Sequence, residues 1–167
     1  MRIGSLIVVG LLVFVTYIVF SGSVSTYDLV AGIVSAIIIG TIFSEFVVKN
    51  PGKVFNPVRW AWLIAYAIYY FFVAEVRAHL DVMYRIIHPR TPVKPGIIMV
   101  PYEVESDYAI TSVANSITNT PGTVVVDIDP EKKVYYVHWI NVKSTKPEEA
   151  RKYISLTFEK YSKKVFD

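Results

Sequence analysis

The sequence predicts an α+β membrane protein. We expect an N-terminal transmembrane helical hairpin, an interfacial or third membrane helix, and a small cytoplasmic domain of βαββα order. Two apolar segments lie within the first 48 residues, and each has the roughly 20 residues that a membrane-spanning helix needs. The chain is 53% hydrophobic, more than is usual for a soluble domain. Beyond residue 96, turn residues separate short segments rich in Val, Ile and Tyr, a pattern typical of strands.

The charge distribution indicates a membrane rather than a nucleic acid as the partner. Residues 1–90 hold seven Lys and Arg against four Asp and Glu, whereas residues 91–167 hold ten of each sign. A nucleic-acid-binding protein would concentrate its surplus on the folded domain. A surplus beside apolar segments instead fits the positive-inside rule and attraction to anionic headgroups. The chain has no cysteine, which excludes disulfides, thiolate metal sites and cysteine nucleophiles.

The two predicted spans are residues 3–20 and 27–48. The first has no charge, and the second has only Asp28 and Glu45, both near its ends. The very short segment before the first span argues against a cleaved signal peptide. We interpret Glu45 as an interfacial residue paired with Lys49 and as a candidate contact to a partner. Small residues spaced along the second span would allow close helix packing, although they are also common in membrane helices generally; they are Gly32, Ser35, Ala36 and Gly40.

Residues 58–74 form an aromatic segment, in which seven of 17 residues are Trp, Tyr or Phe. Aromatic residues favour the membrane interface, so we expect this segment to lie in the interface or dip into it. A third crossing is the alternative, because 17 apolar residues are at the lower limit of span length. Arg77, Asp81 and Arg85 follow at intervals of four, which predicts a salt-bridged helix continuing to about residue 87. Three prolines then end the helix, and residues 91–96 form a stiff linker.

The linker separates a membrane domain, residues 1–90, from a soluble domain, residues 97–167. We expect the first helix of the soluble domain to be capped by Asp107, and the second by a capping box that begins at Thr145. A right-handed crossover with the third strand inserted between the first two gives a split βαβ arrangement, a partial ferredoxin-like sheet. The expected elements are a strand at 97–104, a helix at 107–117, strands at 123–128 and 134–142, and a helix at 147–163.

Two turns connect these elements. Thr120-Pro121-Gly122-Thr123 fits a type II turn, because Pro121 sets φ at the first central position and Gly122 accepts a positive φ at the second. Asp129-Pro130-Glu131-Lys132 fits a type I turn that has Asp129 first and Pro130 second. We predict that these turn residues are structural.

The last strand is apolar on both faces, and one of its faces carries Tyr135, Val137 and Trp139. A sheet that helices cover on one side should have a polar second face. Because neither face is polar here, the second face should meet either the bilayer surface or another protein. We take Tyr135, Val137 and Trp139 as the candidate interface.

We predict no catalytic, cofactor-binding or metal-binding residues. His138 is more typical of a structural strand residue than of a general base, since no carboxylate or nucleophile accompanies it at a suitable spacing. Asp127 and Asp129 end a strand and begin a turn, which is more typical of turn chemistry than of a metal site. The spans have no ionisable residue at mid-membrane depth, so this chain alone should not conduct protons or sodium.

Several motifs together resemble one family. They are Pro95-Gly96-Ile97, the run TSVANSITNTPGT at 111–123, VDIDP at 126–130, and Tyr136-Val137-His138-Trp139. They resemble the E subunit of Mrp/Mnh-type multisubunit sodium/proton antiporters. The resemblance covers essentially the whole chain, from the apolar hairpin through the aromatic segment and proline linker to the C-terminal domain. Members of this family also occur in archaeal membrane-bound hydrogenases and sulfane sulfur reductase complexes.

The resemblance implies an accessory, non-catalytic subunit, without a cofactor, that anchors and helps assemble an ion-translocating complex. Its partners would be other membrane subunits and the lipid bilayer, with no nucleic acid. Its location would be the cell membrane, multi-pass, with the C-terminal domain cytoplasmic. The host is left open between a plain antiporter, a hydrogenase and a sulfur reductase. Two other classes stay open: a free-standing membrane-anchored regulator or ligand-binding protein, and a membrane-tethered hydrolase that uses His138.

Overall fold

The computed structural model describes residues 3–167, so Arg2, one of the cations counted above, lies outside it. The chain divides into two compact units, Met1–Asn56 and Pro57–Asp167. The fold class agrees with the prediction, because apolar helices precede a small three-stranded sheet with its own helices. The division lies well before the predicted linker at 91–96, because the aromatic helix packs against the C-terminal sheet domain.

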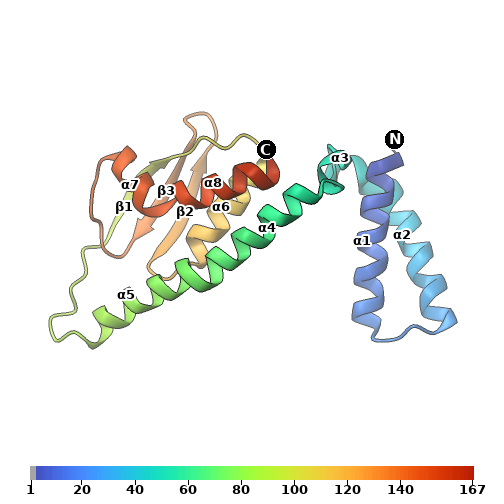
Figure 1. The fold of residues 1–167 in the computed structure, drawn as a ribbon, viewed down its shortest axis with the longest axis horizontal. Helices are drawn as coiled ribbons and strands as arrows, with labels where there is room; N and C mark the ends of the chain where they lie inside the picture. The colour runs from blue at the N-terminus through green and yellow to red at the C-terminus, as the bar shows by residue number, and fades with distance from the viewer. Residues whose placement is uncertain (1–2) are drawn as a thin grey trace. The chain divides into compact units, whose positions relative to one another are not determined.

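The first unit is a helical hairpin (Figure 1). Its long helices are α1, Ile3–Ser21, and α2, Thr26–Val47. The Ser25 hydroxyl caps α2 by accepting a hydrogen bond from the Asp28 backbone N–H at 3.2 Å. The hairpin is followed by one helical turn, α3, Pro51–Val54, which was not predicted from the sequence. Both long helices are apolar and long enough to cross a membrane.

Small residues let α1 and α2 approach closely. A Cβ added at Gly32 would lie 3.1 Å from the rings of Phe14 and Tyr17. A Cβ added at Gly40 would lie 3.5 Å from the Cα of Gly10. Gly32 and Gly40 are therefore packing positions, and the close-packing interpretation of these small residues is confirmed there.

The second unit begins with one long continuous helix (Figure 1). It comprises α4, Pro57–Tyr69, a π-helical turn η1, Tyr70–Ala74, and α5, Glu75–Ile87. The predicted continuation to residue 87 is confirmed, as is the pair Arg85–Asp81, whose Nη2 and Oδ1 atoms lie 2.8 Å apart. At 31 residues the whole helix is also long and apolar enough to be a candidate span. The π turn was not predicted.

The sheet has three strands, β1, Gly96–Pro101, β2, Thr123–Asp129, and β3, Val134–Trp139. Their order is β1-β3-β2, with β3 antiparallel to both neighbours. This order confirms the predicted split βαβ arrangement. Two strands end earlier than predicted, β1 at Pro101 and β3 at Trp139. Pro101 has no backbone N–H to continue the ladder, and Tyr102 and Val104 beyond it are buried all the same.

Three helices accompany the sheet: α6, Asp107–Asn119, α7, Pro147–Ile154, and α8, Leu156–Phe166. The predicted caps were wrong at both positions. Ser106, not Asp107, caps α6 by accepting a hydrogen bond from the Ala109 N–H at 3.2 Å. The predicted capping box is absent at α7, because the Ser144 hydroxyl instead accepts from the Lys146 N–H and donates to Glu149.

The predicted single C-terminal helix is also interrupted. Its two parts, α7 and α8, meet at Ser155, whose ψ of −27° and φ of −113° depart from regular helix. The buried Ser155 hydroxyl donates to the Glu159 carboxylate at 2.6 Å.

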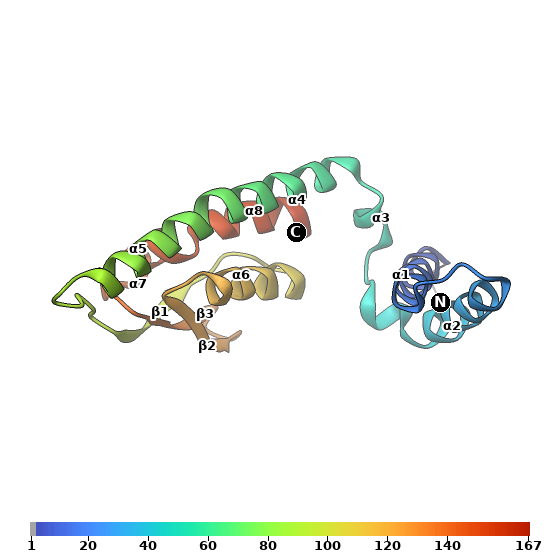
Figure 2. The same ribbon diagram turned by 90° about the horizontal axis from the view of Figure 1, so that it is seen from below.

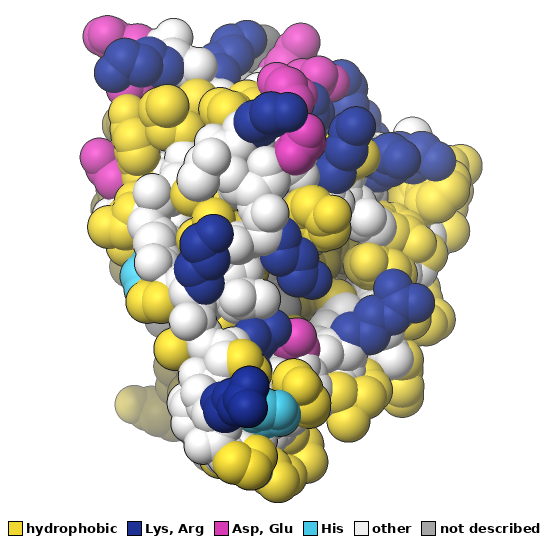
Figure 3. All heavy atoms as spheres, turned by 90° about the vertical axis from the view of Figure 1, so that its left-hand side faces the viewer, with side chains coloured by type: hydrophobic (Ala, Val, Ile, Leu, Met, Phe, Trp, Pro, Cys, Tyr) yellow, Lys and Arg dark blue, Asp and Glu magenta, His cyan; other side chains and the backbone are white. Residues whose placement is uncertain are grey.

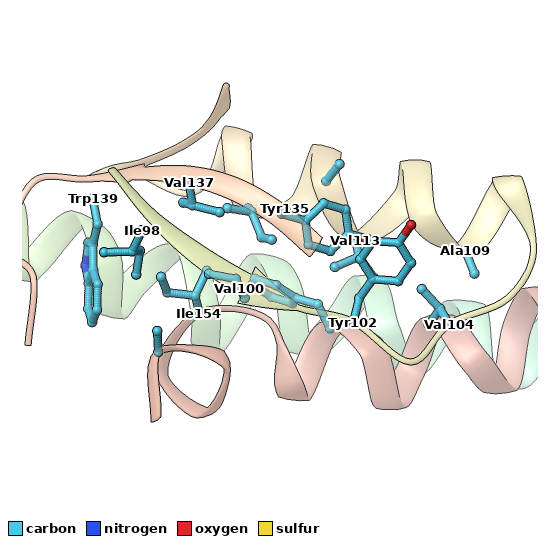
Figure 4. Packing of buried hydrophobic residues seen from close by; sticks show 14 of the residues in the cluster. Ile98, Val100, Tyr102, Val104, Ala109, Val113, Tyr135, Val137, Trp139 and Ile154 are labelled. Carbon is cyan, nitrogen blue, oxygen red and sulfur yellow. The ribbon is translucent and has the colours of Figure 1, made fainter. Parts of the chain in front are cut away.

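The helices of the second unit pack on the sheet and on one another: α6 contacts β2, α7 contacts β1, and α8 contacts both α6 and α4. Figure 2 shows α8 running beside the long helix. The core lies mainly between the sheet and these helices, where Val100, Val113, Tyr135 and Val137 are fully buried (Figure 4). The sheet therefore has helices on one face only.

Candidate functional site

The structure does not assemble a catalytic or metal centre from the candidate polar residues. Within residues 3–167 no three His, Asp or Glu side chains are grouped as metal ligands. His138 lies half-buried on β3, opposite Ile97 on one side and Val124 on the other. Neither neighbour in the sheet is a carboxylate or a nucleophile.

The turn residues predicted from the sequence form the two backbone turns of the domain. Gly122 has φ of +95°, as the second central position of a type II turn requires, and the Thr123 N–H donates to the Thr120 carbonyl. The Asp129 carboxylate accepts from the Lys132 N–H at 3.0 Å and from its Nζ at 2.8 Å. Hydrogen bonding to Lys132 lowers the pKa of Asp129. Lys133, with φ of +53°, completes the hairpin loop, a role that was not predicted.

The candidate interface on β3 was wrong. Tyr135 and Val137 are fully buried and Trp139 is 8% exposed, because α6, α7 and α8 cover that face of the sheet (Figure 4). The Tyr135 hydroxyl donates to the Ile110 carbonyl at 3.0 Å. The fourth candidate, Glu45, lies exposed in the last turn of α2, where its role as a contact stays a prediction.

The apolar second face is the opposite one. We call it the outer sheet face. Its exposed apolar residues are Ile97, Met99, Val124 and Val126, which are 44–63% exposed, and half-buried Tyr136 and His138 of β3 lie between them. No helix of the second unit crosses it (Figure 2). One face of the sheet is thus left uncovered and apolar, as expected, but it is not the face that was predicted. Alternation along a strand separates two faces without saying which one the helices cover.

The side of the long helix that faces the C-terminal domain is lined with aromatic residues. We call it the aromatic seam. Tyr66, only 6% exposed, stacks on Tyr161 of α8 with ring centroids 5.5 Å apart. Tyr69 also stacks on Tyr161, at 5.3 Å. Lys164 Nζ lies 3.6 Å from the centroid of the Trp62 ring. Several aromatic residues that were predicted to meet headgroups therefore hold the long helix to the C-terminal domain.

Polar groups border this seam at the π turn. The Tyr66 hydroxyl is 2.5 Å from the Ser116 hydroxyl of α6. Next to it, the Tyr70 hydroxyl and the Glu75 Oε1 are buried without a hydrogen-bond partner. An open hollow of about 580 Å³ adjoins Tyr70 and Ser116. It is lined by Tyr70, Asp107, Tyr108, Thr111, Ser112, Asn115, Ser116, Asn119 and Phe166, and hydroxyl and amide groups predominate in this set.

Apolar side chains form a stripe along the outward face of the long helix, where Arg77, His79 and Asp81 of α5 are also exposed. We call it the outer stripe; its members are 48–75% exposed. They are Trp60, Ile64, Ile68, Phe71, Phe72, Val76, Leu80, Met83, Ile86 and Ile87. Figure 3 views the unit from the end of α5, where apolar side chains surround Lys or Arg and His side chains at the lower tip, and further basic and acidic side chains gather above it.

An ion network that was also not predicted joins Arg151, Glu159 and Glu103. Arg151 and Glu159 are buried, whereas the Glu103 side chain is 69% exposed. Arg151 bonds Glu159 through Nη2 at 2.9 Å and Glu103 through Nη1 at 2.7 Å. Glu159 is only 4% exposed and also accepts from the Glu103 backbone N–H at 3.0 Å. The hydrogen bond from Arg151 lowers the pKa of Glu103, and the hydrogen bond to Glu103 raises the pKa of Arg151. We assign this network to stability.

Comparison with known proteins identifies related chains. A family model described as MNHE, Na+/H+ ion antiporter subunit, matches residues 10–165. The chain is 32% identical over 158 residues to the E1 subunit of a Na(+)/H(+) antiporter of Staphylococcus epidermidis, covering 95% of both chains. It is 29% identical over 136 residues to the E subunit of the Na(+)/H(+) antiporter of Alkalihalophilus pseudofirmus, covering 81% of this chain and 83% of that one.

One solved structure is similar along the whole chain. It is a chain of the membrane-bound sulfane sulfur reductase, an archaeal respiratory membrane complex. The two share 30% sequence identity and superpose with a TM-score of 0.83, over 98% of this chain and 99% of the other.

Proposed function

This chain belongs to the MNHE family of Na+/H+ ion antiporter subunits, and we propose that it is an accessory, non-catalytic membrane subunit of such a complex. It anchors and helps assemble the complex, while other subunits carry the ions. The family match over residues 10–165 carries this proposal. The hairpin supports it, because Asp28 and Glu45 are the only charged residues in α1 and α2 and both lie near the ends of α2. An ion path needs ionisable groups at membrane depth.

Assembly requires surfaces that the chain does not cover itself. The outer sheet face is such a surface, because its four apolar residues are exposed in the isolated chain. Exposed apolar residues gathered on one face of a sheet are typical of a protein or membrane interaction site. We infer that another subunit of the complex covers the outer sheet face.

The host complex has two candidate types. The similarity to the antiporter subunits of Staphylococcus epidermidis and Alkalihalophilus pseudofirmus favours a plain sodium/proton antiporter. The similarity to a chain of an archaeal sulfane sulfur reductase, at a TM-score of 0.83, favours the antiporter module of a respiratory complex. In either host, this chain has the same accessory role.

Co-purification and ion flux test the accessory role. A tagged chain extracted from its host in mild detergent should bring the other subunits with it, and their masses identify the host. Iron–sulfur subunits indicate a respiratory complex, and their absence indicates a plain antiporter. The chain reconstituted alone should give no sodium-dependent proton flux above empty liposomes. Flux that Glu45→Gln abolishes would overturn the proposal and make Glu45 a conduction site, whereas a chain that purifies alone would favour a free-standing regulator.

We further propose that α1 and α2 cross the membrane and that the N-terminus and C-terminal domain are both cytoplasmic. Lys49, Lys53 and Arg59 follow the second span, whereas the turn between the spans carries no charge. Cations concentrate on the cytoplasmic side of membrane proteins.

Cysteine labelling tests this topology. The chain has no native cysteine, so single replacements at Ser23, Lys53 and Lys143 give unambiguous signals. An impermeant reagent applied outside intact cells should label only the cysteine at Ser23, because that residue lies in the turn between the spans. Labelling at Lys143 would place the C-terminal domain outside. Labelling at Lys53 alone would indicate a third crossing and an outside N-terminus.

A further inference from the structure

We propose that the helix Pro57–Ile87 lies in the plane of the membrane surface as a lipid-binding element. Its outer stripe faces the acyl chains at the headgroup boundary, and the C-terminal domain is docked on its opposite side. The proposal rests on the proposed function only in that the chain is anchored in a membrane. Its ligand is the bilayer surface, preferably one that contains anionic lipids.

The outer stripe has the form of a lipid-facing surface. Residues from Trp60 to Leu80 recur at intervals of four, and each of them is roughly half exposed or more. In an ideal α-helix, each step of four residues rotates the side-chain direction by about 40° around the helix axis. The π turn Tyr70–Ala74 adds about one residue to one turn and so takes back about 100° of this rotation. It therefore keeps the apolar residues of α4 and α5 on one side.

The docked domain excludes a crossing by this helix. Arg59 donates to the Val165 carbonyl at 2.8 Å, and Tyr66 and Tyr69 stack on Tyr161, so α8 runs beside α4. The exposed side chains of α8 include Lys160, Lys163 and Lys164. If α4 spanned the membrane with the domain docked, these lysines would enter the hydrocarbon, where charged side chains are strongly disfavoured.

The length and attachment of the helix fit an in-plane position. Its 31 residues extend about 46 Å, well beyond the roughly 30 Å of a bilayer core. Only nine residues separate the end of α2 at Val47 from its start at Pro57. Because α2 is a span, this short connection holds the start of the helix close to the membrane surface.

The charges beside the outer stripe suit anionic headgroups. Lys164 sits over the Trp62 ring at the border between α4 and α8, and Arg77 is exposed on α5. The exposed carboxylate of Asp81 is paired with Arg85, so it does not offset these cations. Apolar residues flanked by cations are the usual composition of a helix lying in a membrane interface. This combination favours a lipid surface over a second protein as the occupant of the outer stripe.

Depth measurements on the full chain test the proposal. Spin labels are attached to single cysteines at Ile64, Ile68, Phe72 and Leu80, with Lys152 on α7 as the aqueous control. The chain is reconstituted in liposomes of phosphatidylethanolamine and phosphatidylglycerol. The four stripe labels should show the same shallow depth, with high access to oxygen, and the Lys152 label should contact water. If the label depth instead changes steadily along the series and reaches the bilayer centre, the helix is a third span and the proposal is overturned.

The same series in the co-purified complex distinguishes lipid from a neighbouring subunit. Labels covered by protein would lose access both to oxygen and to a water-soluble relaxation reagent. That result would overturn the proposal. Because the liposome series uses this chain alone, it does not depend on whether the chain assembles with others. Failure of the proposed function and failure of this inference therefore give different results.

A cleavage experiment tests whether the outer stripe carries the lipid binding. A protease site replaces residues 52–55, and the reconstituted full chain is cut after insertion. The wild-type fragment should sediment with the anionic liposomes. Ile64→Asp with Phe72→Asp should lower the bound-to-free ratio by roughly tenfold or more, because two stripe positions become charged. Met99→Asp, on the outer sheet face, is the matched control and should stay bound.

Equal release by Met99→Asp, or retention of the doubly substituted fragment, would overturn the proposal. The tryptophan emission of the released fragment shows whether it remains folded. If the double Asp variant unfolds, Ile64→Gln with Phe72→Gln replaces it and should release the fragment to a smaller extent. Retention of that folded variant at the wild-type ratio would equally overturn the proposal.

Discussion

Arg151→Met should destabilise the C-terminal unit by about 3–5 kcal/mol, because removing one member of a buried ion pair leaves the other charge uncompensated. Glu159 is 4% exposed and receives both a 2.9 Å and a 3.1 Å hydrogen bond from Arg151. Without Arg151, its carboxylate would keep only the Ser155 hydroxyl and the Glu103 N–H as donors. The side-chain volume changes little, so most of the loss comes from charge.

Equilibrium unfolding of the full chain in detergent micelles measures this loss. The three tryptophans are Trp60, Trp62 and Trp139, all in the second unit, so their emission follows that unit and not the hairpin. Lys146→Met is the matched control; it removes an ion pair whose side chains are 77% and 47% exposed and should cost at most about 1 kcal/mol. Arg151→Met with Glu159→Gln should recover part of the stability, because it removes the stranded charge. Equal losses for Arg151→Met and Lys146→Met would contradict the prediction.

The same network predicts a pH dependence. Hydrogen bonding to Arg151 lowers the pKa of Glu103. A carboxyl whose folded-state pKa is depressed contributes stability above its unfolded pKa and loses it as the pH falls through the folded value. The wild type should therefore lose stability on acidification below the ordinary carboxyl range, and Arg151→Met should lose less over the same interval.

Tyr66→Ala should weaken the docking of the long helix on the domain by about 3–5 kcal/mol, the usual loss for truncating a buried aromatic residue. Tyr66 is 6% exposed, stacks on Tyr161, and hydrogen bonds Ser116. Tyr66→Phe keeps the ring and should cost only about 1 kcal/mol. The expected result is therefore a large difference between the two substitutions at one position.

Tryptophan emission measures this effect as well, since Trp60 and Trp62 lie on the same helix as Tyr66. Ile64→Ala is the matched control from the outer stripe; Ile64 is 59% exposed, so its truncation in micelles should change the unfolding midpoint little. A loss for Ile64→Ala as large as that for Tyr66→Ala would mean that the outward face, and not the aromatic seam, holds the helix to the domain.

The parts of the fold that follow from local patterns were predictable. Hydropathy located the two spans within one or two residues of α1 and α2, and the βαββα order led to the sheet order β1-β3-β2. Gly122 was identified because only glycine suits a positive φ there without strain.

The parts that depend on long-range packing were not predictable. Both faces of β3 are apolar, so the sequence could not show that Tyr135, Val137 and Trp139 face the helices. The aromatic spacing from Trp62 to Tyr70 fits a headgroup belt as well as a docking seam. Arg151 and Glu159 are eight residues apart with a helix break at Ser155 between them, so helical spacing rules did not pair them.

A three-stranded sheet also leaves two strand edges that could recruit a further strand from another chain. Here β1 and β2 are those edges; β1 is short, and β2 is irregular. Pro101 ends β1 without an N–H to donate, and a bulge between Val125 and Asp127 disrupts β2. Such irregularities suppress β-augmentation and edge-to-edge aggregation. Neither edge therefore offers a long backbone template: β1 has only Gly96–Val100 before Pro101, and the bulge divides β2. Under the proposed function, a partner would recognise the outer sheet face mainly through its side chains.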